Sequence, residues 1–111
     1  MNPPRIQLLV FESLQANVGA EFVRQLVETF ADEAPTLVLQ LRRAALARDA
    51  ESFETFAHAL KGNGIAFGAA RLADMAARLE WQGLDTDAGA IDQLAAELAA
   101  AVAELRVLAQ R

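Results

Sequence analysis

Apolar residues recur at intervals of three and four along almost the whole chain, and no stretch alternates strictly between apolar and polar positions. This spacing gathers apolar side chains on one face of a helix, whereas a strand needs a period of two. The pattern therefore predicts an all-α fold. A short first helix follows Pro3 and Pro4 and ends near Gly19, and four longer helices with short links predict an antiparallel four-helix bundle.

The longest predicted helix contains a proline. From Ala20 to Ala45 the apolar positions keep one helical phase through Pro35, although proline removes a backbone donor and strains the preceding turn. We expect one long kinked helix. The alternative is a break in which Asp32 caps a second helix that has Pro35 in its first turn.

Acidic residues and glycines mark the remaining helix ends. Asp49 is placed to cap the third predicted helix, and Gly68 can end it. Gly83 closes the fourth helix, and residues 85–87 offer caps for the last. The apolar stripe of the third helix consists of Phe53, Phe56, Ala57, Leu60, Gly64 and Phe67, and that of the last of Ile91, Leu94, Ala95, Leu98, Val102, Leu105 and Leu108.

Length and composition narrow the class of protein. The 111 residues, 54% of them hydrophobic, can build a core without disulfides, so we expect residues 1–111 to form a single domain. There is no cysteine, and the formal charge of −5 has the wrong sign for a nucleic-acid or anionic-membrane binder. A partner with a basic rim fits better. We see neither a secretory signal nor an apolar run of ~20 residues, and expect a cytoplasmic protein or a domain of one.

The chain lacks the motifs of most enzymes. It has no glycine-rich phosphate loop and no GxSxG elbow. One histidine without cysteine cannot make an ordinary zinc site, so no metal or other cofactor is expected. Any chemistry must centre on His58.

Helical phase places His58 on the surface. With about 100° per residue, the apolar stripe of the third helix lies within about 60° of Phe53, whereas His58 lies about 140° away. A lone surface histidine is usually an ordinary residue. Here, however, Lys61, the only lysine of the chain, follows at i+3 and Gly62 at i+4, and Gly64 follows at i+6. Each glycine costs a helix about 0.8–1 kcal/mol relative to alanine, so small residues are favoured at this place for another reason.

Phosphoryl transfer would explain the composition of this helix face. A neutral imidazole is nucleophilic near pH 7 and can carry a phosphoryl group on one ring nitrogen. Lys61 would screen the transferred negative charge, and Gly62 would let a partner's active-site loop approach in line. Exposed Ile65 would help to dock that partner, and Glu54 lies one turn before His58 on the same face. The expected partner-binding residues are Gly62, Gly64, Ile65 and Glu54.

The string from His58 to Leu72 resembles the histidine phosphotransfer (HPt) domain. The family pattern is close to H-x-L-K-G-x-x-x-x-x-G-x-x-x-L followed by an acidic or amide residue, and this chain fills every named position. Residues 30–35 and 41–49 also resemble the family's long second helix and the turn after it.

The resemblance implies a phosphocarrier in a two-component phosphorelay, not an enzyme with its own ATP site. His58 would accept a phosphoryl group from a receiver-domain aspartate and pass it to another receiver. Lys61 would assist the phosphoryl group, and Glu80 would accept the N–H of the other imidazole nitrogen. Magnesium would belong to the receiver. The first helix would lie across the bundle near His58 with part of its apolar face available to a partner, which is a receiver or a hybrid sensor kinase. The family favours a monomer.

Three other functions also fit some of these residues. A histidine-kinase dimerisation domain would need an acidic residue after the histidine and an ATP-binding domain, and the chain shows neither. A four-helix metal carboxylate protein would need inward-facing Glu-x-x-His pairs, whereas His58 points outward. An adaptor that binds a receiver or kinase without being phosphorylated stays open, although the presence of both His58 and Lys61 argues against it.

Overall fold

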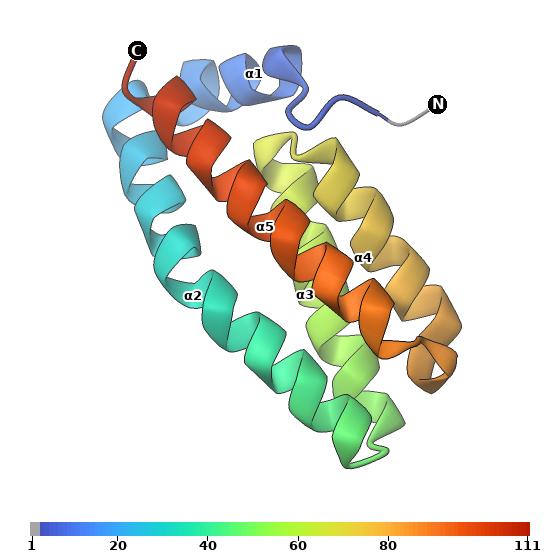
Figure 1. Ribbon diagram of the computed structural model, residues 1–111. Coiled ribbons are helices and arrows are strands. Elements are labelled where there is room, and N and C mark those ends of the chain that lie inside the picture. Colours follow the sequence, from blue (N-terminus) through green and yellow to red (C-terminus); the bar gives the residue numbers. More distant parts are fainter. Residues whose placement is uncertain (1–2) are drawn as a thin grey trace.

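The computed structural model describes residues 3–111, and over that range the chain forms helices and no strand (Figure 1). The elements are α1 (Leu8–Val18), α2 (Ala20–Leu46), α3 (Ala50–Phe67), α4 (Ala70–Gln82), the short 3₁₀ turn η1 (Gly83–Asp85) and α5 (Ala88–Ala109). The predicted all-α fold is confirmed, and η1 is the one described element that the apolar pattern did not predict. None of the described helices has the length and apolar character needed to cross a membrane.

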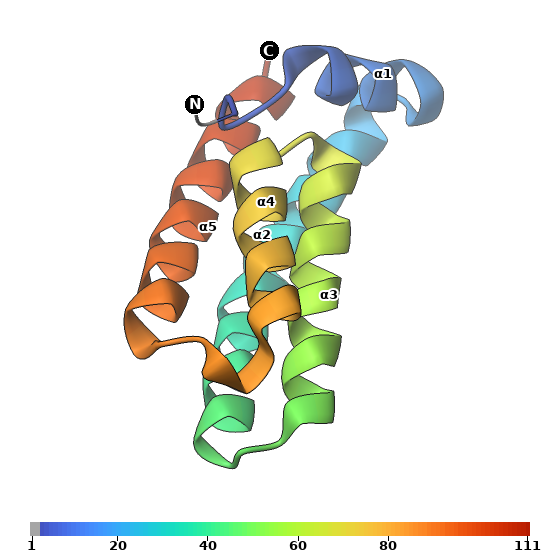
Figure 2. The same ribbon diagram turned by 90° about the vertical axis from the view of Figure 1, so that its right-hand side faces the viewer.

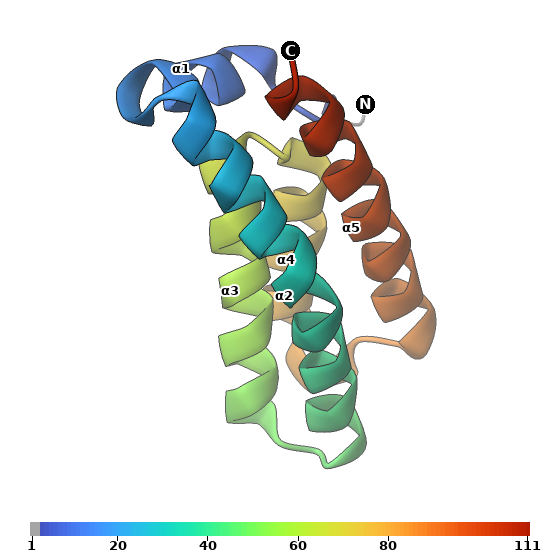
Figure 3. The same ribbon diagram turned by 90° about the vertical axis from the view of Figure 1, so that its left-hand side faces the viewer.

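The four long helices run antiparallel as a bundle, and α1 lies across one end of it (Figures 1 and 3). Helix α2 packs against α3 and α5, while α4 packs against α3 and α5 from the other side. Helices α3 and α5 therefore occupy opposite corners. The predicted four-helix bundle with a short additional N-terminal helix is confirmed, and α3 and α4 share one outer face (Figure 2).

Helix α2 continues without a break through Pro35. The predicted single helix is therefore confirmed, and the alternative with Asp32 as the cap of a separate helix is wrong. One buried face runs along its whole length, through Val23, Val27, Phe30, Ala34, Val38, Leu41 and Ala44. Burial of this continuous stripe outweighs the lost hydrogen bond of the proline.

The predicted ends of α3, α4 and α5 are confirmed by their capping residues. The Asp49 side chain accepts a hydrogen bond from the backbone N–H of Ser52 at 3.1 Å, and Asp87 accepts one from Ala90 at 2.8 Å. Each satisfies a donor that the first turn of a helix leaves unpaired. Gly83 follows the last residue of α4, as expected.

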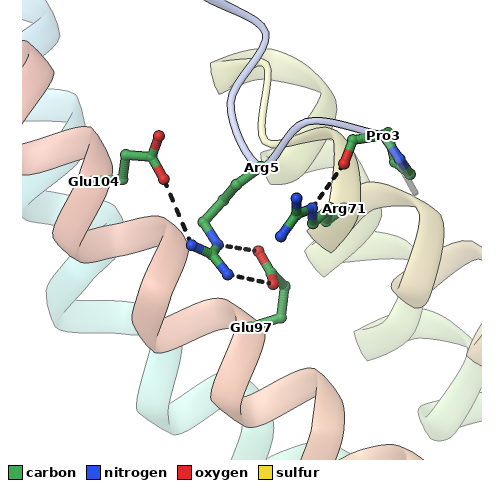
Figure 4. A network of polar contacts seen from close by, with 5 residues as sticks. All are labelled: Pro3, Arg5, Arg71, Glu97 and Glu104. Carbon is green, nitrogen blue, oxygen red and sulfur yellow. Dashed lines mark hydrogen bonds and ion pairs between the residues drawn. The ribbon is translucent and has the colours of Figure 1, made fainter. Parts of the chain in front are cut away.

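Residues 3–5 attach the segment before α1 to α4 and α5 (Figure 4). The Arg71 guanidinium donates to the Pro3 carbonyl at 2.7 Å. The Arg5 guanidinium pairs with Glu97 at 2.9 Å and approaches Glu104 at 3.8 Å. These contacts join residues far apart in the chain and hold the segment that precedes α1.

Gly68 joins the turn between α3 and α4 to this N-terminal segment. Its φ of 76° lies in the left-handed region, and its carbonyl accepts a hydrogen bond from the Gln7 N–H at 2.8 Å. A Cβ at this position would lie 2.9 Å from the Gln7 carbonyl oxygen and from Cβ of Val10. Glycine is required here both by the backbone conformation and by the close approach of α1.

Candidate functional site

His58 lies near the middle of α3 with its side chain 67% exposed. The buried positions of α3 face the other way and are Phe53, Ala57, Leu60, Gly64 and Phe67. The outward orientation predicted from helical phase is therefore confirmed. Phe56, which belongs to the predicted apolar stripe, is half-buried at its edge.

A carboxylate from the neighbouring helix holds the histidine and the lysine together. On α4, Oε2 of Glu80 lies 2.8 Å from Nδ1 of His58, and Oε1 accepts a hydrogen bond from Nζ of Lys61 at 2.6 Å. The Glu80 and Lys61 side chains are 20% and 29% exposed, so both stems are packed between α3 and α4 while the histidine ring stands outside. The three side chains form one connected polar cluster that joins α3 to α4.

The Glu80 carboxylate is stabilised in its charged form. The hydrogen bond from Lys61 lowers its pKa below the ordinary 4.5, partial burial opposes this, and the contact with His58 lowers it further. At neutral pH the group is therefore an anion that can only accept hydrogen bonds.

The charge of Glu80 determines the tautomer of His58. Since the carboxylate accepts, Nδ1 of the neutral ring must carry the proton and donate it. Nε2 then carries the free lone pair, and no hydrogen bond within residues 3–111 occupies it. The ring thus presents its nucleophilic nitrogen to solvent.

A shallow hollow of about 470 Å³ lies beside the ring and is lined by Glu51, Glu54, Thr55, His58 and Glu80. Three of these five side chains are carboxylates, so the surface next to His58 is acidic. A more apolar groove lies between α2 and α5, lined in part by Pro35, Val38, Leu98 and Val102, and includes none of the cluster residues.

The two glycines beside His58 have different surroundings. Gly62 is exposed, and a Cβ built on it meets nothing within 4 Å. Gly64 is buried, and its Cβ would lie 2.9 Å from the backbone nitrogen of Ala73 on α4. Its burial agrees with the predicted apolar stripe, and the prediction that Gly64 contacts a partner is wrong, because its missing side chain permits α3 and α4 to approach. Ile65, 60% exposed, and Glu54 lie on the outer surface as predicted.

Helix α1 lies across the end of the bundle where α3 finishes. His58 precedes Gly68 by ten residues, a rise of about 15 Å along the helix. Ile65 lies between them, and on α1 itself Leu8 and Leu9 are 49% and 80% exposed. The expected apolar surface of the first helix is present, separated from the histidine by about three turns of α3.

Several features of the site were missed at the level of sequence. Glu51 and Thr55 lie seven and three residues before His58, and this helical spacing would have placed them beside it. Trp81, which is 89% exposed directly after Glu80, was not singled out. The contact of Glu80 with His58 depends on how α4 packs, and only the family resemblance pointed to it.

No group of three or more His, Asp or Glu residues within residues 3–111 is arranged to hold a metal ion. Glu54 and His58, the pair that the metal carboxylate alternative needed inside the bundle, are both on the surface.

A family model described as the Hpt domain matches residues 25–104. The matched range contains α3, α4 and the His58, Lys61 and Glu80 cluster, and it leaves α1 outside. Comparison with curated proteins and with solved structures found no match.

Proposed function

The chain belongs to the Hpt domain family and so has a histidine phosphotransfer role in phosphorelays, and on that premise we propose that His58 is the residue that carries the phosphoryl group. The observation that supports this most directly is the contact of Nδ1 with the Glu80 carboxylate, which leaves Nε2 exposed as the nucleophile. The donor is an aspartyl phosphate on a receiver domain, and a second receiver aspartate accepts the group afterwards.

The transfer needs no additional base, because no proton has to leave the ring when Nε2 attacks. The Nε2 lone pair of the neutral ring attacks phosphorus in line, the P–O bond of the aspartyl phosphate breaks, and the receiver regains a free carboxylate. The ring keeps its Nδ1 proton, and the positive charge that it acquires faces the Glu80 anion. In the second step a carboxylate of another receiver attacks, the P–N bond breaks, and neutral imidazole leaves.

The neighbours of His58 have distinct parts in the proposal. Lys61 lies one turn further along α3 and contributes the positive charge nearest to the phosphoryl oxygens. Gly62 leaves open space where the receiver loop approaches. Ile65 contacts the receiver, and Glu54 with the adjacent carboxylates selects a receiver that has a basic rim.

Under this proposal residues 1–111 form a single phosphotransfer domain, and residues 1 and 2 lie outside the range that the structure describes. The chain is then a monomeric phosphocarrier in the cytoplasm that has no ATP site of its own and exchanges phosphoryl groups with response-regulator receivers, including one of a hybrid sensor kinase. Members of this family are phosphocarriers and not kinases.

Incubation with a receiver domain phosphorylated by acetyl phosphate tests the assignment. We expect the chain to acquire a phosphate that is labile in acid and stable in alkali, and His58→Gln to abolish it. Labelling that survives His58→Gln would contradict the assignment. Receivers that bind the chain without labelling it would favour the adaptor function instead.

A further inference from the structure

Trp81 is the only tryptophan of the chain and its side chain is 89% exposed, the highest fraction among the large hydrophobic residues described. Tryptophan is normally a well-buried residue, because its ring carries a large apolar surface. Trp81 does not belong to the core cluster or to the residues packed against it. Folding of the bundle therefore leaves the apolar surface of this indole exposed to solvent.

Helix α4 places Trp81 on the outer surface of the bundle. Trp81 lies about 180° around the helix from buried Leu72, so its side chain projects from the outer face of α4. Its neighbours one turn earlier are Ala77, which is too small to cover the ring, and Arg78, whose guanidinium pairs with Asp74 at 2.7 Å. Trp81 is the last residue but one of α4, so no further turn of this helix covers the ring.

Trp81 is continuous with the phosphotransfer site. It follows Glu80 directly in the chain, and the Glu80 carboxylate contacts His58 at 2.8 Å. A standard interface buries about 800 Å² on each partner, which corresponds to a disc of about 16 Å radius. A contact patch of that size centred on His58 extends across the Glu80 side chain to the neighbouring residue of α4.

We propose that Trp81 is an aromatic anchor for the receiver domain that docks over His58, and that this receiver buries the indole in an apolar recess. The inference rests on the proposed function, since it is the phosphotransfer partner that brings a protein surface to this face. Tryptophan is enriched among the few interface residues that carry most of the binding energy, and a rigid ring loses little conformational entropy on binding. A receiver that lacks the recess would bind more weakly, so Trp81 contributes to the choice among receivers.

The test uses the lone tryptophan as its own probe. The full chain is produced with 5-fluorotryptophan, and a receiver domain that labels His58 is added after phosphorylation by acetyl phosphate. We expect the ¹⁹F resonance to shift and acrylamide quenching of the indole fluorescence to fall in the complex. A receiver without tryptophan keeps the fluorescence signal specific to this chain.

Variants separate docking from chemistry. Trp81→Ala should raise the receiver concentration that gives half-maximal transfer by about 10- to 100-fold, with the maximal rate and the thermal midpoint close to those of the parent. Val107→Ala is the matched control, because Val107 is also exposed but lies on α5, the corner opposite α3. It should leave the transfer unchanged.

The outcomes distinguish this inference from the proposed function. If the receiver labels His58 normally while the indole stays fully open to acrylamide and Trp81→Ala behaves as the parent, Trp81 is not an anchor but the phosphocarrier function stands. If the free chain is a dimer with a protected indole, a second copy covers Trp81 and the inference is overturned. If no receiver labels His58, the proposed function fails, and the inference fails with it.

Discussion

Glu80 holds the ring of His58 from the neighbouring helix, with its Oε2 atom 2.8 Å from Nδ1. The contact joins two helices that are separated in the chain by the turn at Gly68, so the orientation of the ring depends on how α3 and α4 pack. It also distinguishes the two ring nitrogens, because only Nε2 is left without a protein partner among the described residues.

Removal of the Glu80 carboxylate should slow phosphotransfer and leave the bundle folded. A hydrogen bond to a charged group is lost in Glu80→Ala, and its usual strength corresponds to a decrease of about 10- to 100-fold in rate. Glu80→Gln keeps an oxygen that can accept the Nδ1 proton, so it should restore part of the rate. Single-turnover transfer from a phosphorylated receiver measures both variants, and an unchanged rate in Glu80→Ala would remove Glu80 from the site.

The lowered pKa of Glu80 predicts a pH dependence of stability. A carboxyl group whose pKa is lower in the folded chain binds fewer protons there than in the unfolded chain, so its contribution is present above about pH 4.5 and is lost as the pH falls through the folded pKa. Urea unfolding at pH 7 and at pH 3 should therefore show that the difference in stability between the parent and Glu80→Gln shrinks at the lower pH. Lys61→Met should raise the pKa of Glu80 in a ¹³C NMR titration, because the hydrogen bond from Lys61 is the main cause of the shift. A pKa of Glu80 that does not respond to Lys61→Met would contradict this account.

The two glycines near His58 should respond in opposite ways to alanine. Gly62→Ala adds a methyl group in open space within a helix and should stabilise the chain by about 0.5–1 kcal/mol. Gly64→Ala places its Cβ against the Ala73 backbone and should cost about 1–3 kcal/mol. Urea midpoints of the two variants give the comparison. Under the proposed function Gly62→Ala also slows transfer from the receiver although the fold is stabilised, and a variant that transfers at the parental rate would show that Gly62 does not control access.

The sequence predicted the fold well because local signals and long-range packing agree. Asp49, Gly68 and Asp87 mark helix ends by chemistry that acts within one turn, and the apolar stripes of α2 and α3 are periodic over many turns. The same arithmetic placed His58 outside the core. Packing between helices is not periodic in this sense. Helical phase placed Gly64 on the buried stripe, but its missing side chain is explained by Ala73, a residue of another helix, and not by a partner.

Arg5 should control how firmly α1 is held. Its pairing with Glu97 fixes the chain just before Gln7, whose N–H is bonded to the Gly68 carbonyl. Arg5→Ala should therefore increase the hydrogen exchange rate of the Gln7 amide more than that of the bundle core. Arg78→Ala, which removes an ion pair with Asp74 on the surface of α4, is the matched control. Equal exchange at Gln7 in both variants would show that Arg5 does not hold this segment.

Pro35→Ala should stabilise α2. Alanine restores a backbone donor in the middle of a continuous helix and removes the clash of the proline ring with the preceding turn. Part of this gain is offset because proline restricts the unfolded chain, so we expect about 1–2 kcal/mol in urea unfolding. A decrease in stability would show instead that the shape of the helix at Pro35 is needed for its packing against α5.

The site shows which functional residues can be predicted from the sequence alone. His58, Lys61 and Gly62 are neighbours on one helix, so their spacing was sufficient to suggest phosphoryl chemistry. Glu80 is 22 residues away from His58 and meets it only through the packing of α3 on α4. The exposure of Trp81 is the opposite case, since the helical phase that placed His58 outside the core also places Trp81 about 180° from Leu72.

The fastening of the N-terminal segment to α5 has a consequence for synthesis. Arg5 pairs with Glu97, and Arg24 at the start of α2 donates to the carbonyl of Ala109. Neither contact can form before α5 has been synthesised. At about 5–20 residues per second the ribosome reaches that helix about 5–20 s after it makes Arg5. During this interval α3 and α4, whose partners are close in the chain, can already pair. Helix α1, which packs on α2 and α3, can also dock during this interval, whereas the contacts of Arg5 and Arg24 form only when α5 arrives. The surface around His58 can therefore assemble before the segment that precedes α1 is tied to α5.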